Sequence, residues 1–497
     1  MSTPTNLFRG WPNPSLHPTA ALAAASAAVL STPSLAAPAL SYGPDQGALT
    51  LREQVGRWLG GFYYPNSLYT GEISNPVGSE RICISGGASQ NLACLLQTFT
   101  DVGYTRNVWM VAPTYYLACR IFEDAGFAGR LRAVPEDAEG VDLEVLEAGL
   151  RGCEQRERDG ERVDEPSTYK TSQTHKPPRP WRKIYKHIIY TTSTFSNPSS
   201  CVMSLRRRER LVRLARKYDA LIVSDDVYDF LQWPAQPMSQ SPTQTASPST
   251  SVSAASPGEE NQPFPTHALV PRIVDVDRYL DGGPVDEWGN AMSNGSFSKI
   301  VGPGCRVGWA EGTKQFAYGL SQTASSRSGG CPSQLSSSFL THLLSTNTLQ
   351  THIRSVLQPA LSRRYHALTA AVRTHLVPLG VELAEPSTTT DSNTNTNTNN
   401  SIAGGYFLWL RLPAGVRASE LAKRAQEEEN LVVAGGNLFQ VSGAEAEGGV
   451  AVDDFQGFVR LCFAWEEEGR FEEAVVRLAR VIGREMEGAG AEVRDTI

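Results

Sequence analysis

The chain has 497 residues, of which 40% are hydrophobic and 8% aromatic, and its formal net charge is −7. This length predicts two domains with insertions, and the acidic balance argues against nucleic acid or a membrane as the main partner. The eight cysteines include no CxxC or Cys/His metal spacing, so we expect free thiols, no bound metal and a reducing, cytoplasmic setting.

Residues 19–40 form an Ala-rich, apolar run that resembles a secretory signal, with Arg9 upstream of it. The run is too short and too rich in alanine for a membrane span. We therefore predict an ordinary helix in this segment.

Three later stretches are predicted to be insertions, because none of them can bury enough apolar surface to offset its ordering entropy. Residues 152–180 are charged and then rich in Lys and Pro, residues 236–266 are rich in Ser, Thr, Gln and Pro, and residues 386–401 form a Thr/Asn repeat. We expect mobile surface loops at all three.

Short apolar runs between them predict strands at Arg81–Ser85, Val108–Ala112, Ile184–Thr191, Ala220–Ser224, Met292–Phe297 and Val307–Trp309. Helical patterns lie between several of these runs, at Asn91–Thr100, Tyr116–Ala125 and Leu205–Lys217. This alternation predicts an α/β fold with a mostly parallel sheet covered by helices on both faces. Active groups should then lie at the carboxyl ends of the strands. The basic run Arg206-Arg207-Arg208 is interpreted as a solvated helix face.

The pattern changes after about residue 350. A long amphipathic helix, three strands and a closing helix are predicted at Leu357–Leu376, Tyr406–Leu412, Leu431–Val433, Val459–Phe463 and 467–485. This order is typical of a smaller α+β domain. We expect an N-terminal segment at 1–40, a large domain at 41–345 and a small domain at 346–497.

Lys299 is a candidate covalent handle, because it lies between hydroxyls and a glycine-broken turn. Ser296, Ser298 and Arg306 could together hold a phosphate dianion. A reactive lysine beside a phosphate clamp suggests pyridoxal phosphate held as a Schiff base. A surface lysine in a Gly/Ser loop explains this stretch equally well when it is taken alone.

Three turns after predicted strands could hold other parts of a cofactor. Gly86-Gly87-Ala88-Ser89-Gln90 leads into a helix whose free N–H groups can bind an anion, although a plain turn is the commoner use of Gly-Gly. Tyr115 could stack on a planar ring, and core packing is the usual alternative. Asn197, ahead of a proline, could donate to a ring oxygen or simply form an Asx-type turn.

Buried charges are expected at two further strands. Asp225 and Asp226 end an apolar run, where a carboxylate needs a partner such as a pyridinium nitrogen, and Tyr228 could donate to the same ring. A helix N-cap would explain one of the two acids. Arg460 alternates with apolar residues and therefore needs an anion, either a substrate carboxylate or a structural ion-pair partner.

The order and spacing of these motifs resemble the class I/II aminotransferases of pyridoxal-phosphate fold type I, in particular the 2-aminoadipate/kynurenine aminotransferase-like branch with its fungal members. The resemblance extends from residue 7 to the last helix. Its most specific pieces are Ser296-Phe297-Ser298-Lys299 with Arg306, and Asp225-Asp226-Val227-Tyr228. It implies a large domain with a seven-stranded-type sheet, and a smaller α+β domain formed by the C-terminal part and the N-terminal segment.

The resemblance also implies how pyridoxal 5'-phosphate would be held. Lys299 would be the Schiff-base lysine and the proton shuttle, and Asp225 would form a salt bridge with the ring nitrogen. Tyr115 would stack on the ring, while Asn197 and Tyr228 would hold its oxygen. The implied phosphate ligands are Gly87, Ala88, Ser89, Ser296, Ser298 and Arg306.

Three more positions follow from the same resemblance. Tyr42 matches a tyrosine that reaches the phosphate of the neighbouring subunit in this family, which implies a homodimer with shared active sites. Arg460 would bind the substrate carboxylate, and Gly10 with Trp11 would line the entrance. The family usually has Asn-Pro-Thr-Gly or Asn-Pro-Gly-Gly where this chain has Asn-Pro-Ser-Ser from Asn197, so we expect a different turn there.

The implied activity is ping-pong transfer of an amino group between an L-amino acid and a 2-oxo acid. The sequence permits aromatic, long aliphatic or 2-aminoadipate-like donors and does not select among them. One alternative on the same scaffold is a lyase, or an enzyme of γ-substitution or carbon–carbon bond formation. The other is a non-catalytic regulator, which the retention of Lys299, Asp225 and Arg460 argues against.

Overall fold

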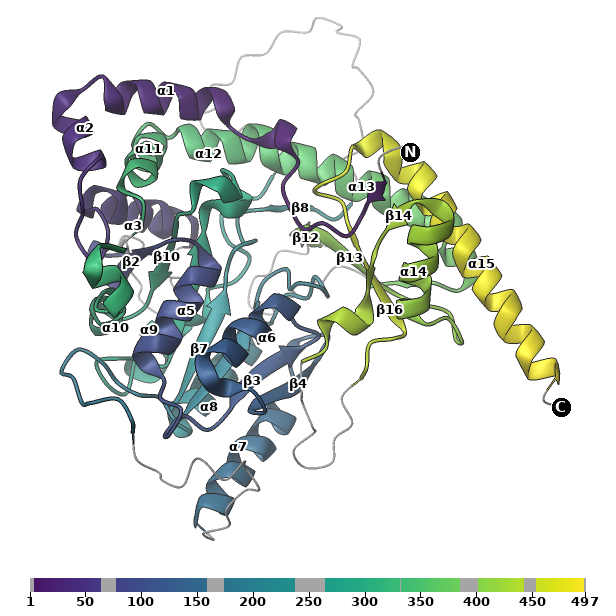
Figure 1. Ribbon diagram of the computed structural model, residues 1–497, viewed down its shortest axis with the longest axis horizontal. Helices are drawn as coiled ribbons and strands as arrows, with labels where there is room; N and C mark the ends of the chain where they lie inside the picture. Colours follow the sequence, from purple (N-terminus) through teal and green to yellow (C-terminus); the bar gives the residue numbers. More distant parts are fainter. Residues whose placement is uncertain are drawn as a thin grey trace, which may run out of the picture.

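The computed structural model describes residues 4–63, 77–158, 174–236, 264–330, 332–384, 401–441 and 453–495, with side chains up to residue 487 (Figure 1). Most of the three predicted insertions, at 159–173, 237–263 and 385–400, lies outside these residues. The prediction of a loop from residue 152 is wrong for its first part, because helix α7 (Leu143–Arg158) continues to residue 158. Leu143, Leu146 and Leu150 anchor that helix on the sheet, and its polar last turns extend beyond the sheet.

The central sheet of the described chain has eight strands in the order β2-β10-β9-β7-β6-β3-β4-β5. The pairings from β9 through β7, β6 and β3 to β4 are parallel, whereas the pairings of β10 with β2 and β9, and of the short edge strand β5 with β4, are antiparallel. The strands are β2 (Ile82–Ser85), β3 (Val108–Ala112), β4 (Leu131–Asp137), β5 (Gly140–Val141), β6 (His187–Thr191), β7 (Ala220–Asp225), β9 (Ala291–Ser296) and β10 (Gly308–Glu311). The predicted α/β class with a mostly parallel sheet is confirmed. Strand β4 escaped prediction because its polar residues and Pro135 hide the apolar pattern.

Helices cover both faces of this sheet, because alternate side chains of a strand point to opposite faces. Val108 and Met110 of β3 pack in one core with α5 (Ala88–Phe99), α6 (Tyr116–Phe122) and α10 (Lys314–Ser321). Trp109 and Val111 pack in another core with α7, α8 (Leu205–Lys217) and α9 (Ile273–Tyr279). Strand β3 is therefore apolar on both sides, as is typical of a central strand in a buried parallel sheet.

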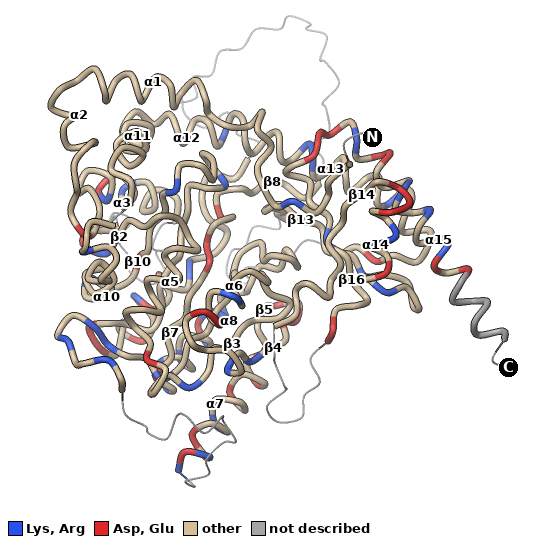
Figure 2. Tube along the Cα trace, in the orientation of Figure 1, with Lys and Arg blue, Asp and Glu red and all other residues tan. Residues whose placement is uncertain are grey.

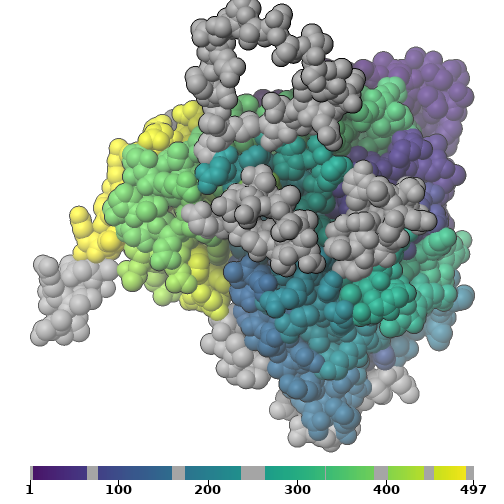
Figure 3. Space-filling model, turned by 180° about the vertical axis from the view of Figure 1, so that it is seen from behind, coloured from purple at the N-terminus to yellow at the C-terminus, as the bar shows by residue number. Residues whose placement is uncertain are grey.

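The C-terminal part builds a second layer around a four-stranded sheet in the order β11-β13-β16-β15. Its strands are β11 (Glu382–Leu383), β13 (Phe407–Arg411), β15 (Ala434–Gly435) and β16 (Phe458–Cys462), and its helices are α13 (Gln358–His375), α14 (Ala418–Glu429) and α15 (Phe471–Asp495). Strand β1 (Thr5–Asn6) pairs with β14 (Leu431–Val432), so the chain start joins this layer. Strand β8 (Gln232–Pro234) pairs with β12 (Ile402–Gly404) and bridges the two layers, which lie side by side in Figure 3. The predicted domain boundaries stay a prediction.

The Ala-rich N-terminal run forms two helices rather than one, α1 (Thr19–Leu30) and α2 (Pro33–Ala39). The break follows from Pro33, which fits the first turn of a new helix. Both helices contact α11 (Gln334–Ser345), and α11 also contacts α3 (Leu49–Tyr63) and α12 (Thr348–His352). No single described helix is long and apolar enough to cross a membrane; α1 and α2 meet that criterion only together, as a pair bent by 104°.

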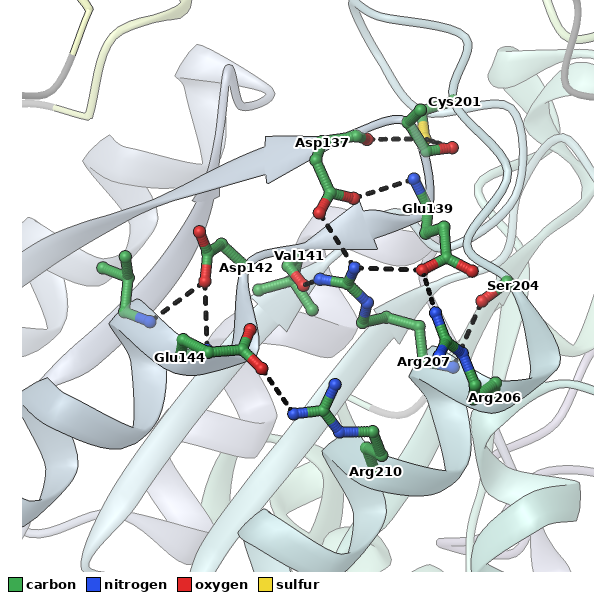
Figure 4. Close-up of polar contacts among 12 residues, drawn as sticks. Asp137, Glu139, Val141, Asp142, Glu144, Cys201, Ser204, Arg206, Arg207 and Arg210 are labelled. Carbon is green, nitrogen blue, oxygen red and sulfur yellow. Dashed lines mark hydrogen bonds and ion pairs between the residues drawn. The ribbon is translucent and has the colours of Figure 1, made fainter.

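The interpretation of residues 206–208 as a solvated face is wrong for two of the three arginines. Arg207 is buried and donates to the Asp137 carboxylate at 2.8 Å and to the Val141 carbonyl, so it fastens α8 to the β4–β5 hairpin (Figure 4). Arg208 is fully buried and donates to three carbonyl oxygens and the Thr194 hydroxyl. Of the three, only Arg206 is exposed, and it forms an ion pair with Glu139. Hydrogen-bond acceptors on neighbouring loops make the burial of the two guanidinium groups possible.

Candidate functional site

The carboxyl ends of three neighbouring parallel strands converge on one place. Tyr115 follows β3, Asn197 follows β6 and Asp225 ends β7. Lys299 lies at the end of the 3₁₀ turn Phe297–Lys299, directly after β9, and Arg460 reaches the same place from β16 of the smaller sheet. The structure therefore brings together residues that are far apart in the sequence.

The amine of Lys299 lies between the Gly10 carbonyl and two tyrosine rings. Its Nζ donates to the carbonyl oxygen of Gly10 at 2.7 Å and lies 5.7 and 5.3 Å from the ring centroids of Tyr228 and Tyr406. Burial lowers the pKa of this amine to about 8, and the nearby Arg460 guanidinium acts in the same direction. A larger fraction of the amine is thus neutral, and nucleophilic, near neutral pH than in a free lysine.

Asp225 is a buried carboxylate with donors on both oxygens. The Tyr190 hydroxyl donates to Oδ2 at 2.9 Å, and the Asn294 amide donates to Oδ1 at 3.3 Å. Burial raises the pKa of Asp225 to about 7. A cation beside it would stabilise the charged form, which is what a protonated ring nitrogen offers. Asp226 points elsewhere, and its Oδ1 accepts from the Ser224 hydroxyl at 2.6 Å.

Arg460 is only 3% exposed and forms no ion pair with a carboxylate of the described residues. Its Nη1 donates to Asn197 Oδ1 at 2.7 Å and its Nη2 to the Phe8 carbonyl at 2.6 Å. Phe407 and Phe439 pack against the guanidinium at 4.0 and 4.7 Å. Its Nε finds no acceptor in the described part of the chain, so this cation still has capacity for an anion.

The predicted phosphate ligands form a second group around the start of α5. Gly87 has a φ of +101°, and a Cβ atom placed on it would lie 2.8 Å from Arg306 Nη2, so this position requires glycine. Arg306 Nη2 donates to the Gly86 carbonyl at 2.6 Å, and Arg306 is exposed. Ser296 and Ser298 are joined through their hydroxyls at 2.8 Å. Gly308, which pairs with Ser296, lies against Gly87 and connects the two parts of the group.

The remaining predicted residues differ in position. Gly10 is part of the site through its carbonyl oxygen. Trp11 lies at its edge, 53% exposed, with its ring against Trp465 at a centroid distance of 5.7 Å. Tyr42 does not reach the site of its own chain and is 86% exposed.

The Asn197 turn contains a serine where glycine would be expected. Ser200 has a φ of +61°, in the left-handed region that favours glycine and costs other residues about 1 kcal/mol. Its N–H donates to the Ser196 carbonyl at 2.7 Å and its hydroxyl to the Phe407 carbonyl at 2.7 Å. These bonds offset the cost and hold the turn against β13.

Four residues of the site were not predicted from the sequence: Tyr190, Asn294, Asn91 and Tyr406. The Tyr406 hydroxyl donates to the Lys299 carbonyl at 3.1 Å, and Asn91 Nδ2 donates to Asn294 Oδ1 at 2.7 Å. The sequence held one sign of Asn294: this amide lies within a predicted buried strand, where a polar side chain needs hydrogen-bond partners.

A cavity of about 1030 Å³ is a separate feature of the described chain. It lies between the two layers, and Glu136, Cys201, Tyr365 and Trp409 are among the residues that line it, whereas Lys299, Asp225 and Arg460 are not. The candidate site and this cavity share only a wall, formed by parts of the 195–200 loop and Phe407.

Comparison with known proteins identifies the family. The family model described as aminotransferase class I and II matches residues 14–478. An uncharacterized protein of Saccharomyces cerevisiae, YER152C, is 33% identical over 89% of this chain and 90% of its own length.

Characterised relatives are more distant. Aromatic-amino-acid aminotransferase 1 of Thermococcus litoralis is 25% identical over 91% of this chain and 82% of its own. The 2-aminoadipate transaminase of Thermus thermophilus is 26% identical over 95% and 88%. A crystal structure of the α-aminoadipate aminotransferase from that organism superposes with a TM-score of 0.66 at 22% identity, over 97% of this chain and 93% of the other.

Proposed function

The chain belongs to the class I and II aminotransferases, which use pyridoxal phosphate, and from this premise we propose that it transfers amino groups from L-amino acids with aromatic or long side chains to 2-oxo acids. We propose Lys299 as the residue that carries the cofactor and Arg460 as the residue that binds the substrate carboxylate. The donor class rests on the two characterised relatives. The aromatic rings of Tyr228 and Tyr406 near Lys299 are compatible with it.

A single observation carries the proposal: the buried guanidinium of Arg460 has no carboxylate partner in the described chain, and the Phe407 ring against it contacts the Tyr228 and Tyr406 rings near Lys299. Burying a charge is expensive unless an ion or hydrogen bonds compensate it. Within the described residues, Arg460 has only neutral oxygens as partners and one unpaired Nε, so an incoming carboxylate would complete its coordination. Every amino-acid donor and every 2-oxo acid acceptor has such a carboxylate.

The residues around Lys299 fit pyridoxal phosphate. Gly87 leaves room at the start of α5, where free N–H groups and Arg306 favour a phosphate. Asp225 supplies a carboxylate at the depth where the ring nitrogen would lie, and Asn197 and Tyr228 supply groups for the ring oxygen. When bound, the cofactor supplies an electron sink for the bond broken at the substrate α-carbon.

The protein's own residues would then orient the substrate and move a proton. Arg460 would hold the carboxylate, which leaves the α-carbon facing Lys299. The Nζ of Lys299, with a pKa of about 8, would accept the proton from the substrate α-carbon and then donate it to the cofactor. The Tyr406 hydroxyl fixes the backbone of Lys299 by donating to the Lys299 carbonyl oxygen.

We also propose a homodimer with shared active sites. Residues 10–44 contain no Lys, Arg, Asp or Glu, and Figure 2 shows α1, α2 and α11 without charged positions. Leu35, Leu40 and Tyr42 are exposed on this uncharged surface. Such a surface is typical of an interface with a second copy. We propose a cytoplasmic location, in keeping with the described cysteines, all of which are free.

The proposed function is tested with the purified holoenzyme, a panel of L-amino acids and 2-oxoglutarate. Glutamate should form with aromatic donors or with 2-aminoadipate, in amounts equal to the new keto acid. Ammonia or a cleaved side chain without glutamate would instead establish a lyase.

Arg460→Ala is expected to raise the KM of the donor about 100-fold, because loss of a buried charge-assisted partner costs about 3 kcal/mol. The Lys299 amine and the cofactor contacts remain, so cofactor binding should change less. Steady-state kinetics with the best donor of the panel measures this. Arg411→Ala, on the exposed face of β13, is the matched control and should leave KM unaltered. An unchanged KM in Arg460→Ala would refute the carboxylate assignment.

The capture of pyridoxal phosphate by the apoenzyme is expected to depend on pH through Lys299. The neutral amine is the nucleophile, and with a pKa of about 8 its fraction rises roughly tenfold from pH 7 to pH 9 and then levels off. A lysine with the usual pKa of about 10.4 would still be rising steeply at pH 9. Stopped-flow reconstitution across this range distinguishes the two. A Lys299→Ala variant reports capture by other lysines.

The dimer is tested by light scattering, which should give twice the 54.0 kDa of one chain. Tyr42→Phe is expected to raise the dissociation constant of pyridoxal phosphate roughly fivefold, since it removes one hydrogen bond of about 1 kcal/mol. Tyr318→Phe changes another exposed tyrosine and should have no effect. A monomer with full cofactor affinity would contradict the shared site.

A further inference from the structure

Asn294 is a buried amide in the middle of the proposed cofactor site. It lies on β9, five positions before Lys299, and only 1% of its surface is exposed. Its Nδ2 donates to Asp225 Oδ1 at 3.3 Å and to the Ala88 carbonyl at 3.2 Å, and its Oδ1 accepts from Asn91 Nδ2 at 2.7 Å. This one side chain contacts both the acid and the phosphate turn.

The sheet explains why Asn294 can reach both. Strand β7 lies between β6 and β9, and Asp225 is the register partner of Asn294 across the parallel pair. Tyr190 on β6 approaches the carboxylate from the other side and donates to Oδ2 at 2.9 Å. Asp225 is therefore held from both neighbouring strands, with one donor for each oxygen.

The second half of the connection leads to helix α5. Ala88 follows Gly87 in the phosphate turn, and Asn91 lies in the first turn of the helix, where its N–H donates to the Gly87 carbonyl at 2.9 Å. Asn91 is also almost fully buried. The start of α5 is thus fastened to β9 by two hydrogen bonds that both end on Asn294.

We propose that Asn294 is a positioning residue that fixes the distance between the ring-nitrogen carboxylate and the phosphate turn, with Tyr190 as its counterpart on the opposite side of Asp225. This inference rests on the proposed function, because it assumes that Asp225 faces the ring nitrogen. Such a connection should increase the affinity for a rigid cofactor that is bound at two ends. Protein groups that are already held in place lose little entropy when the cofactor binds.

The connection also bears on the protonation of Asp225, whose pKa is raised by burial to about 7. Hydrogen bonds donated to a carboxylate favour its charged state, and the bond from Tyr190 opposes the effect of burial. Without Asn294, three groups would be left without their present partner: Asp225 Oδ1, the Ala88 carbonyl and the Asn91 amide. A carboxylate with one free oxygen can rotate, and its alignment with the ring nitrogen is then lost.

The test compares Asn294→Leu with Asn290→Leu. Asn290 precedes the other end of β9 and is equally buried, and its side-chain amide donates to the Ala215 and Ala220 carbonyls, far from the site. The two substitutions make the same chemical change at the two ends of one strand. Titration of each apoenzyme with pyridoxal phosphate should show a dissociation constant at least tenfold higher for Asn294→Leu and unchanged for folded Asn290→Leu.

A cofactor analogue with C–H in place of the ring nitrogen separates positioning from general damage. It offers Asp225 no cation, so Asn294→Leu should weaken its binding much less than that of pyridoxal phosphate. In steady state, kcat should fall while the donor KM stays near the wild-type value, because Arg460 is untouched. Equal weakening for both compounds, or an unchanged dissociation constant, overturns the inference.

Tyr190→Phe is the second variant and covers the case in which Asn294→Leu does not fold. It removes one hydroxyl from Oδ2 and should raise the dissociation constant of pyridoxal phosphate roughly fivefold, again with little effect on the analogue. No change in Tyr190→Phe would overturn the two-sided support of Asp225. If the wild-type apoenzyme binds no pyridoxal phosphate, the proposed function itself fails, which is a different result from an unaffected variant.

Discussion

Lys299→Ala is expected to lower kcat by at least about 10³-fold, the largest effect of any single substitution in the site. The substitution removes the proposed covalent handle, which is also the group proposed to move the α-proton, and a general acid–base group alone contributes about 10²–10⁴-fold. Phosphate contacts and Asp225 remain, so the variant should still bind pyridoxal phosphate without the visible absorbance of the lysine-bound form. Single-turnover assays and absorbance spectra measure the two effects separately.

Lys314→Ala provides the matched control for this substitution. Lys314 lies exposed on α10, where it pairs with Glu80 at 3.0 Å, and its loss should affect neither kcat nor the spectrum. Addition of a small primary amine should restore part of the proton transfer in Lys299→Ala, because the space left by the side chain is adjacent to the site. A variant that keeps both the visible absorbance and the wild-type rate would remove Lys299 from the mechanism.

The sequence predicted the large sheet well because its strands are short, apolar and followed by recognisable turns. Asp225, Asn197 and Tyr115 follow β7, β6 and β3, and parallel strands place their carboxyl ends at one edge. The convergence of these residues could therefore be expected once the alternation of strands and helices was recognised. Lys299 and Arg306 came from a motif and needed no knowledge of the fold.

The connections inside the site could not be predicted, because they depend on strand order and register. Asn294 is opposite Asp225 because β9 is the neighbour of β7, although 69 positions separate the two residues along the chain. The burial of Arg208 has a similar origin, since its acceptors come from loops at 193–194, 203 and 271. A residue's own sequence neighbours give no information on such partners.

Asp225→Asn is expected to lower kcat by about 10²- to 10³-fold while the protein stays folded. The substitution keeps the shape of the side chain and removes its charge. Loss of one partner of the proposed buried ion pair with the ring nitrogen costs about 3–4 kcal/mol, and each 1.36 kcal/mol is a factor of ten in rate. Tyr190 can still donate to the amide oxygen. The loss should therefore appear in the chemical step and in cofactor affinity rather than in folding, as single-turnover rates and thermal melts of the apoenzyme would show.

The protonation of Asp225 predicts how cofactor affinity changes with pH, and it provides a control for the substitution. The carboxylate has a pKa of about 7 in the structure, so it is charged above pH 7 and becomes neutral as the pH falls. Cofactor affinity of the wild type should accordingly weaken below pH 7, and Asp225→Asn should lose that dependence. Asp226→Asn removes the adjacent buried carboxylate, whose Oδ1 accepts from the Ser224 hydroxyl, and should lower thermal stability. This variant should keep a pH dependence, shifted to lower pH because the charge of Asp226 raises the pKa of Asp225. The two acids are neighbours in sequence and both are buried, so a difference between the two variants must come from where each side chain points in the fold. An identical pH profile in Asp225→Asn and wild type would mean that the charge beside the ring comes from another group.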